Sequence, residues 1–147
     1  KVKRYYGVYE KQFIKYFRMA ERTKGNNGTA LLTLLERRLD NVVYKLGLAG
    51  SRASARQTIS HGHIYINGRR VNIPSFLVNV GDKIALKDAE RSRKLVQGRL
   101  EELGEPHLQE WLRLDMTKLA AEVVALPGRE DVQIPIEENL IVELCSQ

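Results

Sequence analysis

Four arginines in a short stretch are the residues whose type and spacing most clearly indicate a chemistry. Arg52 and Arg56 lie four positions apart, and Arg69 and Arg70 follow. The nineteen residues that these arginines span contain no Asp or Glu. A guanidinium group presents a fork of donors that matches two phosphate oxygens. We therefore predict a surface that contacts RNA or DNA, against the alternative that each arginine lies on an ordinary solvated face.

A short capped helix is expected to position the first two arginines. Ser51 is a favourable N-cap because its hydroxyl can accept a hydrogen bond from an amide one turn further on. Gly62 suits the left-handed residue that ends many helices. Residues four apart leave a helix from one face, so Arg52 and Arg56 should point the same way.

A tight hairpin is expected to position the other two arginines. Asn67-Gly68 tolerates positive φ at both central positions of a turn, and the apolar runs 64–66 and 71–73 flank it. Two more strands are predicted at 76–80 and 83–86 around Gly81-Asp82. Together they predict an antiparallel sheet on which the helices pack.

Helical patterns precede this stretch. Residues 10–22 carry apolar side chains at helical spacing, and residues 24–28 are rich in turn formers. A wide apolar stripe then predicts one helix from Thr29 to Leu46, ended by Gly47, with Arg37, Arg38 and Lys45 on its solvent face. Tyr5 and Tyr6, near the start, could stack on unpaired bases or be half-buried.

The segment after residue 87 contains fewer signals. Helices are predicted near 95–103 and 137–144, and residues 119–126 are ambiguous between helix and strand. Trp111, the only tryptophan, is assigned to the core or to packing on the sheet rather than to base stacking.

The charge distribution is strongly asymmetric. The net charge is +6, but residues 1–70 hold 15 Lys and Arg against 4 Asp and Glu, whereas residues 71–147 hold 9 against 14. The first part should therefore carry the surface for a polyanion, and the second should face solvent or another protein.

The remaining composition argues against several classes of protein. A lone Cys145 excludes an internal disulfide and fits a reducing compartment. His61 and His63 lie across a helix stop and His107 is isolated, so we expect no metal site and no cofactor. No apolar run reaches membrane-spanning length and no signal peptide is visible. The first residue is Lys1 rather than Met, so we expect a fragment of a longer protein.

These motifs resemble a known family. The similarity is carried by Ser51-Arg52, Ala55-Arg56-Gln57, His61-Gly62-His63-Ile64, Asn67-Gly68, residues 71–75 and Val80-Gly81-Asp82, with residues 38–49 ahead of them. The chain resembles the S4 family of bacterial small-subunit ribosomal proteins, which contains a small RNA-binding module. The similarity extends over nearly the whole chain, from Tyr6 to Glu143, although the final residues 144–147 depart from the aromatic-rich ending usual in the family.

The resemblance implies an α+β fold in which both chain ends form a small helical domain and an RNA-binding domain, with helices packed on an antiparallel sheet, is inserted between them. The expected ranges are 1–37 for the first part of the helical domain, 38–100 for the S4-type module, 101–133 for its extension and 134–147 for a returning C-terminal helix.

The resemblance also implies a function. The chain is expected to be a structural protein of the small subunit that grips a helical junction in the 5′ domain of its rRNA, nucleates assembly and contributes to translational accuracy. Its expected partners are that rRNA, the neighbouring fifth small-subunit protein and its own mRNA, with no membrane and no small-molecule substrate. We expect a cytoplasmic ribosome, and an organellar one stays open.

The expected site consists of residues able to hold phosphates, sugars or base edges. The rRNA-binding set is Arg38, Lys45, Ser51, Arg52, Arg56, Gln57, His61, His63, Asn67, Arg69, Arg70 and Asn72, with further contacts possible at Lys3, Arg4, Tyr5 and Lys11.

Two other functions are weighed against this one. Arg38-Leu39-Asp40 echoes the catalytic aspartate stretch of pseudouridine synthases, but it precedes the module and no enzyme-sized domain follows, so an ion-pairing or capping Asp40 is preferred. The second alternative is a module whose basic half binds an acidic protein, which competition by structured RNA would distinguish.

Overall fold

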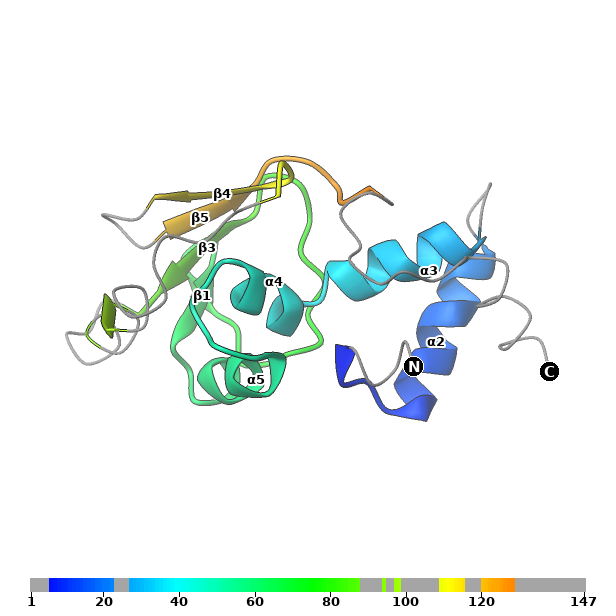
Figure 1. Cartoon of the computed structure of the whole chain (residues 1–147), viewed down its shortest axis with the longest axis horizontal. Coiled ribbons are helices and arrows are strands. Elements are labelled where there is room, and N and C mark those ends of the chain that lie inside the picture. Colours follow the sequence, from blue (N-terminus) through cyan, green and yellow to red (C-terminus); the bar gives the residue numbers. More distant parts are fainter. Residues whose placement is uncertain are drawn as a thin grey trace. The chain divides into compact units, whose positions relative to one another are not determined.

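The computed structural model describes residues 6–22, 27–87, 94, 97–98, 109–115 and 120–128 (Figure 1). The chain divides into two compact units. Unit 1 comprises Lys1–Glu36 and Pro127–Gln147, and unit 2 comprises Arg37–Leu126. The helix predicted over 137–144, and nearly all of the one over 95–103, lie outside the described residues. The domain boundaries predicted at residues 101 and 134 also fall there and stay predictions.

Unit 1 contains helices α2 (Glu10–Glu21) and α3 (Asn27–Glu36), which pack together. The predicted helix over 10–22 is confirmed, and its aromatic residues Phe13, Tyr16 and Phe17 are buried. Tyr6 is fully buried and its hydroxyl donates to the buried Glu36 carboxylate. Of the two roles considered for Tyr6, burial is therefore the one observed.

The single helix predicted from Thr29 to Leu46 is wrong, because the chain breaks into α3 and α4 (Leu39–Lys45). Arg38 between them is extended and bridges Leu77. The first N–H groups of a helix have no partner within it. Here the Leu39 and Asp40 amides donate to carbonyls of Phe76 and Pro74, at 2.8 and 3.1 Å. Because these amides bond to a distant segment and not to the preceding turn, α3 does not continue into α4.

The capped helix and the hairpin are confirmed. Helix α5 (Arg52–Ser60) begins after Ser51, whose hydroxyl accepts from the Ser54 amide at 3.0 Å. Strands β1 (Ile64–Ile66) and β2 (Arg69–Arg70) flank a turn in which Asn67 and Gly68 have φ of 52° and 82°. Both residues occupy the left-handed region that the sequence required of them.

The described strands form one antiparallel sheet in the order β2-β1-β3-β5-β4. Strand β3 covers Lys83–Leu86, β4 Leu112–Asp115 and β5 Ala120–Val123, so the ambiguous segment over 119–126 contains a strand. The strand predicted over 76–80 is absent, because this segment is bound to the start of α4 rather than to a sheet neighbour. The α+β class with an antiparallel sheet is confirmed.

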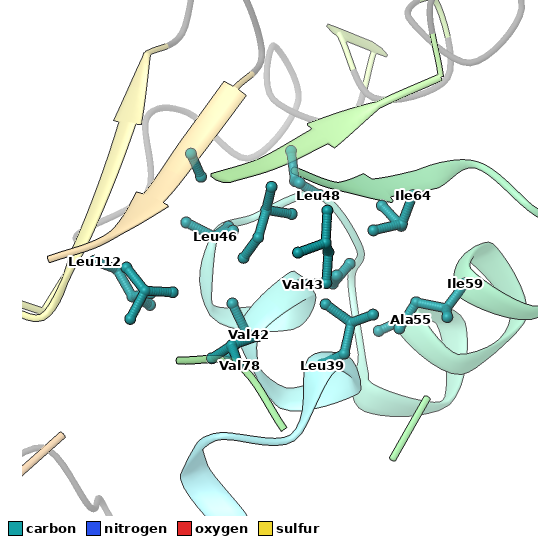
Figure 2. Packing of buried hydrophobic residues seen from close by; sticks show 14 of the residues in the cluster. Leu39, Val42, Val43, Leu46, Leu48, Ala55, Ile59, Ile64, Val78 and Leu112 are labelled. Carbon is teal, nitrogen blue, oxygen red and sulfur yellow. The ribbon is translucent and has the colours of Figure 1, made fainter. Parts of the chain in front are cut away.

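The core of unit 2 lies between this sheet and helices α4 and α5 (Figure 2). The strand register places Ile66, Ile84 and Ala121 in one row across three strands, and all three are buried. Val43 from α4 and Ile59 from α5 belong to the same cluster. Each fully buried aliphatic side chain contributes about 1.5–3 kcal/mol, so the helices are held firmly on the sheet. Trp111 is 1% exposed, which confirms its predicted role in the core.

Candidate nucleic-acid interface

Arg52 is held in place at the start of α5. Its Nε donates to the Asn41 Oδ1 atom at 2.9 Å, and its guanidinium carbon lies 4.7 Å from the centre of the Tyr44 ring. A cation over an aromatic face is attracted by about 0.5–2 kcal/mol. A cation in the first turn opposes the helix dipole, so this placement costs local stability and favours an incoming anion instead. Arg52 is thus a pre-oriented cation at the N-terminal end of α5.

Arg56, one turn further along α5, lies beside a buried ion cluster. Its Nη1 atom is 3.3 Å from the Asp40 Oδ2 atom, and its side chain is 33% exposed. Arg38 donates to both oxygens of the same carboxylate, at 3.1 and 3.0 Å. The ion-pairing role predicted for Asp40 is confirmed.

Arg38, which was predicted on the solvent face of a helix as a phosphate ligand, lies buried instead, so the structure does not favour a direct phosphate contact. Arg38 is only 4% exposed, because the start of α4 is bound to the segment around Phe76 and carries Arg38 inward. Its guanidinium group forms the bidentate pair with Asp40. The sequence shows a cation on a helix but not the chain break that buries it.

The hairpin brings Arg70 back to α5. Arg70 pairs with Tyr65 across the strands, and its guanidinium carbon is 5.9 Å from the Tyr65 ring centre. A methyl group added to Gly62 would meet the Arg70 Cδ atom at 3.4 Å, so the Arg70 side chain lies along the C-terminal end of α5. Arg52, Arg56 and Arg70 thus follow α5 over about 15 Å. We call these three residues the α5 arginines.

Arg69 lies differently. Alternate residues of a strand point to opposite faces of the sheet, so Arg69 and Arg70 leave on different sides. Arg69 is exposed, and its side chain has no hydrogen bond or ion pair with another residue in the described ranges.

Asn67 braces the turn, and both ends of its side-chain amide are engaged. Its Nδ2 donates to Asp82 Oδ1 at 3.0 Å and its Oδ1 accepts from the Lys83 amide at 2.9 Å. The other Asp82 oxygen accepts from the Asn79 amide at 2.8 Å, and Arg37 donates to Asn79 Oδ1 at 2.8 Å. Asn67 therefore supports the hairpin tip, and direct RNA contact through its amide is not favoured.

The other predicted site residues lie around α5 or beyond it. Gln57, His61 and Asn72 are exposed, whereas His63 is half-buried. Ser51 is exposed but uses its hydroxyl as the cap. Lys45 donates to Gln109 at 3.1 Å, which ties it to the segment before β4. Lys3, Arg4 and Tyr5 lie outside the described residues.

A second basic feature, on α2 in unit 1, extends beyond the predicted Lys11. Lys11, Lys15, Arg18 and Arg22 recur at intervals of four, three and four, which places them on one helical face opposite Phe13 and Tyr16. All four are exposed, and none pairs with an acid within the described parts of the chain. We call them the α2 ridge. Their spacing was visible in the sequence.

Burial influences one further cation. Burial lowers the pKa of the Arg37 guanidinium, and the nearby Asp82 carboxylate opposes this shift. Arg37 donates from Nε to the Val78 carbonyl at 2.9 Å, so it stabilises the segment after the hairpin. Within the described ranges, no group of three or more His, Cys, Asp or Glu side chains could hold a metal ion. No helix in those ranges is long and apolar enough to cross a bilayer.

Comparisons with known proteins identify the family of the chain. Residues 37–84 match the S4 domain, and residues 1–36 match the ribosomal protein S4/S9 N-terminal domain. The chain is 52% identical to small ribosomal subunit protein uS4 of Ruminiclostridium cellulolyticum, over its whole length and 71% of the relative. The same values hold for small ribosomal subunit protein uS4 of Acetivibrio thermocellus and of Halothermothrix orenii. The chain therefore belongs to the family of small ribosomal subunit protein uS4, whose members are structural proteins of the ribosome and not enzymes.

Proposed function

We propose that this chain binds small-subunit rRNA through the α5 arginines and the hairpin beside them. The observation that carries the proposal is that Arg52, Arg56 and Arg70 are each held by a neighbouring group of the fold while remaining partly or fully exposed. Pre-oriented cations lose less side-chain freedom on binding than mobile ones. The sequence from Ser51 to Asn72 contains no acidic residue, and the Asp40 carboxylate beside Arg56 is buried and paired with Arg38.

The contacts are assigned by chemistry. The α5 arginines and Arg69 bind phosphate oxygens. Four polar residues of the same helix–hairpin stretch donate to sugars or base edges: Gln57, His61, His63 and Asn72. RNA is recognised largely by shape, backbone and 2′-hydroxyl groups, which suits a rigid helix–hairpin unit. Lys45 and Ser51 act mainly through the fold, by their bonds to Gln109 and Ser54.

The target we propose is a helical junction in the 5′ domain of the small-subunit rRNA. Binding there would let the chain nucleate subunit assembly and influence translational accuracy on a cytoplasmic ribosome. Contacts with the neighbouring fifth small-subunit protein and with the chain's own mRNA belong to the same proposal. These finer assignments rest on the resemblance of the motifs around α5 to the family.

The test is binding of the 147-residue chain to a 5′-domain transcript from Ruminiclostridium cellulolyticum across a salt titration. Transfer RNA and a plain RNA duplex serve as competitors. We expect a steep salt dependence, because phosphate contacts release counterions, together with a clear preference for the 5′ domain. Equal affinity for all three RNAs would contradict the proposed target, and tighter binding to an acidic protein than to any RNA would contradict RNA binding itself.

A further inference from the structure

One carboxylate lies beside the hairpin that is proposed to bind RNA. Asp82, directly before β3, is half-buried and bonded to Asn67 at the hairpin tip. A negative charge close to a phosphate-binding surface repels the phosphate, so on charge alone Asp82 lowers RNA affinity. Within the described residues it forms no ion pair with Arg69 or Arg70, which we call the hairpin arginines. Its hydrogen bonds indicate a different role.

Asp82 accepts hydrogen bonds from two parts of the chain at once. Its Oδ1 atom accepts from the Asn67 side-chain amide at 3.0 Å, and its Oδ2 atom accepts from the Asn79 backbone amide at 2.8 Å. Each oxygen has its own donor, so a side chain with a single acceptor oxygen cannot make both bonds in this geometry. Asp82 thus joins the hairpin tip to the segment before β3.

The bond to Asn67 fixes the turn. Asn67 has a φ of 52°, in the left-handed region that residues other than glycine seldom occupy. Its Oδ1 atom accepts from the Lys83 amide, and its backbone amide donates to the Lys83 carbonyl, both at 2.9 Å. Because a carboxylate only accepts, Asp82 determines which end of the Asn67 side-chain amide faces Lys83. The hairpin arginines follow directly, so the direction in which they leave depends on this turn.

The other side of Asp82 is anchored as well. Arg37 donates from Nη2 to Asn79 Oδ1 at 2.8 Å and from Nε to the Val78 carbonyl at 2.9 Å. The Val78 amide in turn donates to the Arg37 carbonyl at 3.0 Å. A continuous hydrogen-bonded path therefore runs from Arg37, ahead of α4, through Asn79 and Asp82 to Asn67 at the hairpin tip.

We propose that Asp82 is a positioning residue for RNA binding: it holds Asn67, and through it the hairpin arginines, in the orientation that meets phosphate oxygens. This inference rests on the proposed rRNA binding. It predicts that removing a negative charge from beside the RNA surface lowers RNA affinity, which is opposite in sign to the electrostatic effect of the same change.

The experiment measures the affinity of the 147-residue chain for the 5′-domain transcript at a fixed salt concentration. Asp82→Asn keeps the shape of the side chain but leaves one of its two donors facing an amide nitrogen, which cannot accept. Affinity should therefore fall several-fold. Glu122→Gln is the matched control, because Glu122 lies opposite Lys83 on β5 and its side chain has no hydrogen bond or ion pair in the described parts of the chain. This variant should bind RNA at least as tightly as wild type.

An exchange of the two side chains separates hydrogen bonding from charge. In Asn67→Asp/Asp82→Asn, the new amide at position 82 can donate to the new carboxylate at position 67 and still accept from the Asn79 amide. The Lys83 amide keeps an acceptor at position 67, and Asp tolerates the left-handed region as Asn does. The exchange should therefore bind RNA more tightly than Asp82→Asn alone, although it carries one more negative charge.

A further comparison shows whether Asp82 acts through the hairpin. In the Arg69→Ala/Arg70→Ala background, Asp82→Asn should cause no additional loss of affinity, because the groups that Asp82 positions are gone. A general loss of packing would instead lower affinity by the same factor in both backgrounds, since independent effects add in free energy.

The proposal is overturned if folded Asp82→Asn binds as tightly as wild type, if the exchange binds no better than Asp82→Asn, or if the loss is the same without the hairpin arginines. If Asp82→Asn does not fold, as judged by circular dichroism, NMR relaxation of backbone amides in the wild-type chain decides. Gly68 and Arg69 must then be as ordered as Tyr65, and a mobile turn overturns the inference. A wild-type chain without preference for the 5′-domain transcript contradicts the proposed function, which is a separate result.

Discussion

The two basic features of this chain present positive charge in different ways. The α5 arginines of unit 2 are each engaged with a ring or a carboxylate of the fold, as in the 4.7 Å contact of Arg52 with Tyr44. The α2 ridge of unit 1 is exposed and has no acidic partner within the described residues. The difference shows that the number of cations in a segment does not measure how well they are prepared to bind a phosphate.

The α5 arginines and the α2 ridge should differ in how much each contributes to RNA affinity. A long mobile side chain loses up to about 2 kcal/mol of conformational freedom when it is fixed. The α5 arginines have already lost much of this freedom in the folded chain. The ridge residues lose it only when they bind RNA, which lowers their net contribution to affinity. We therefore expect unit 2 to determine where RNA binds and the α2 ridge to add general electrostatic attraction.

The largest effect is expected from Arg52→Ala. It removes the bond to Asn41 and the contact with Tyr44, so it should weaken RNA binding by about 1–3 kcal/mol and also lower the melting temperature. Lys15→Ala on α2 is the matched control and should leave the melting temperature unchanged. If the folded Arg52→Ala chain bound RNA with wild-type affinity, the α5 arginines would not contribute more to binding than the α2 ridge.

The second-largest effect is expected from Gly68→Val. Gly68 has a φ of 82°, a conformation that β-branched residues rarely adopt, so we expect a loss of about 1–3 kcal/mol in the free energy of unfolding. RNA affinity should fall too, because the turn aims the hairpin arginines. Gly98→Val is the control, since Gly98 lacks a positive φ and no atom of the described residues lies within 4 Å of the position of an added Cβ. Identical denaturation curves for the two variants would refute the tight turn.

A smaller effect is expected from Lys15→Ala/Arg18→Ala on the α2 ridge. The free energy of unfolding should change by less than about 0.5 kcal/mol, as is usual for exposed side chains. Affinity should fall by a similar factor for 5′-domain RNA, transfer RNA and duplex, which competition titrations measure. A loss restricted to the 5′-domain transcript would show that the ridge, too, helps to select the target.

The smallest effect is expected from Arg69→Ala. Arg69 belongs to unit 2, but within the described ranges its side chain has no hydrogen bond or ion pair, so it should behave like a ridge residue. Affinity should fall by less than about 1 kcal/mol, the range for exposed charge pairs, with no change in melting temperature. A loss as large as that of Arg52→Ala would mean that exposure matters more than orientation.

Local signals in the sequence predict much of this arrangement. The Ser51 cap, the Gly62 stop and the Asn67-Gly68 turn each depend on chemistry within a few residues, and all three are observed. Apolar runs on either side of two short turns likewise predict the antiparallel sheet. These features need no information from distant parts of the chain.

The errors share one physical cause, which is bonding between distant segments. The break before α4 arises because Leu39 and Asp40 donate to carbonyls more than thirty residues away. That same break buries Arg38, so the mistaken solvent-face position of Arg38 follows from the mistaken helix. The strand expected over 76–80 is absent for the reciprocal reason, since Phe76 supplies one of those carbonyls and the Val78 amide donates to the Arg37 carbonyl. Local pattern cannot reveal such pairings.

The most direct test of the central claim is ultraviolet cross-linking of the wild-type chain to the 5′-domain transcript, with cross-linked peptides identified by mass spectrometry. We expect the cross-links to concentrate between Ser51 and Asn72, the span of α5 and the hairpin. Cross-links confined to the α2 ridge or to strands β4 and β5, with none in that span, would contradict it.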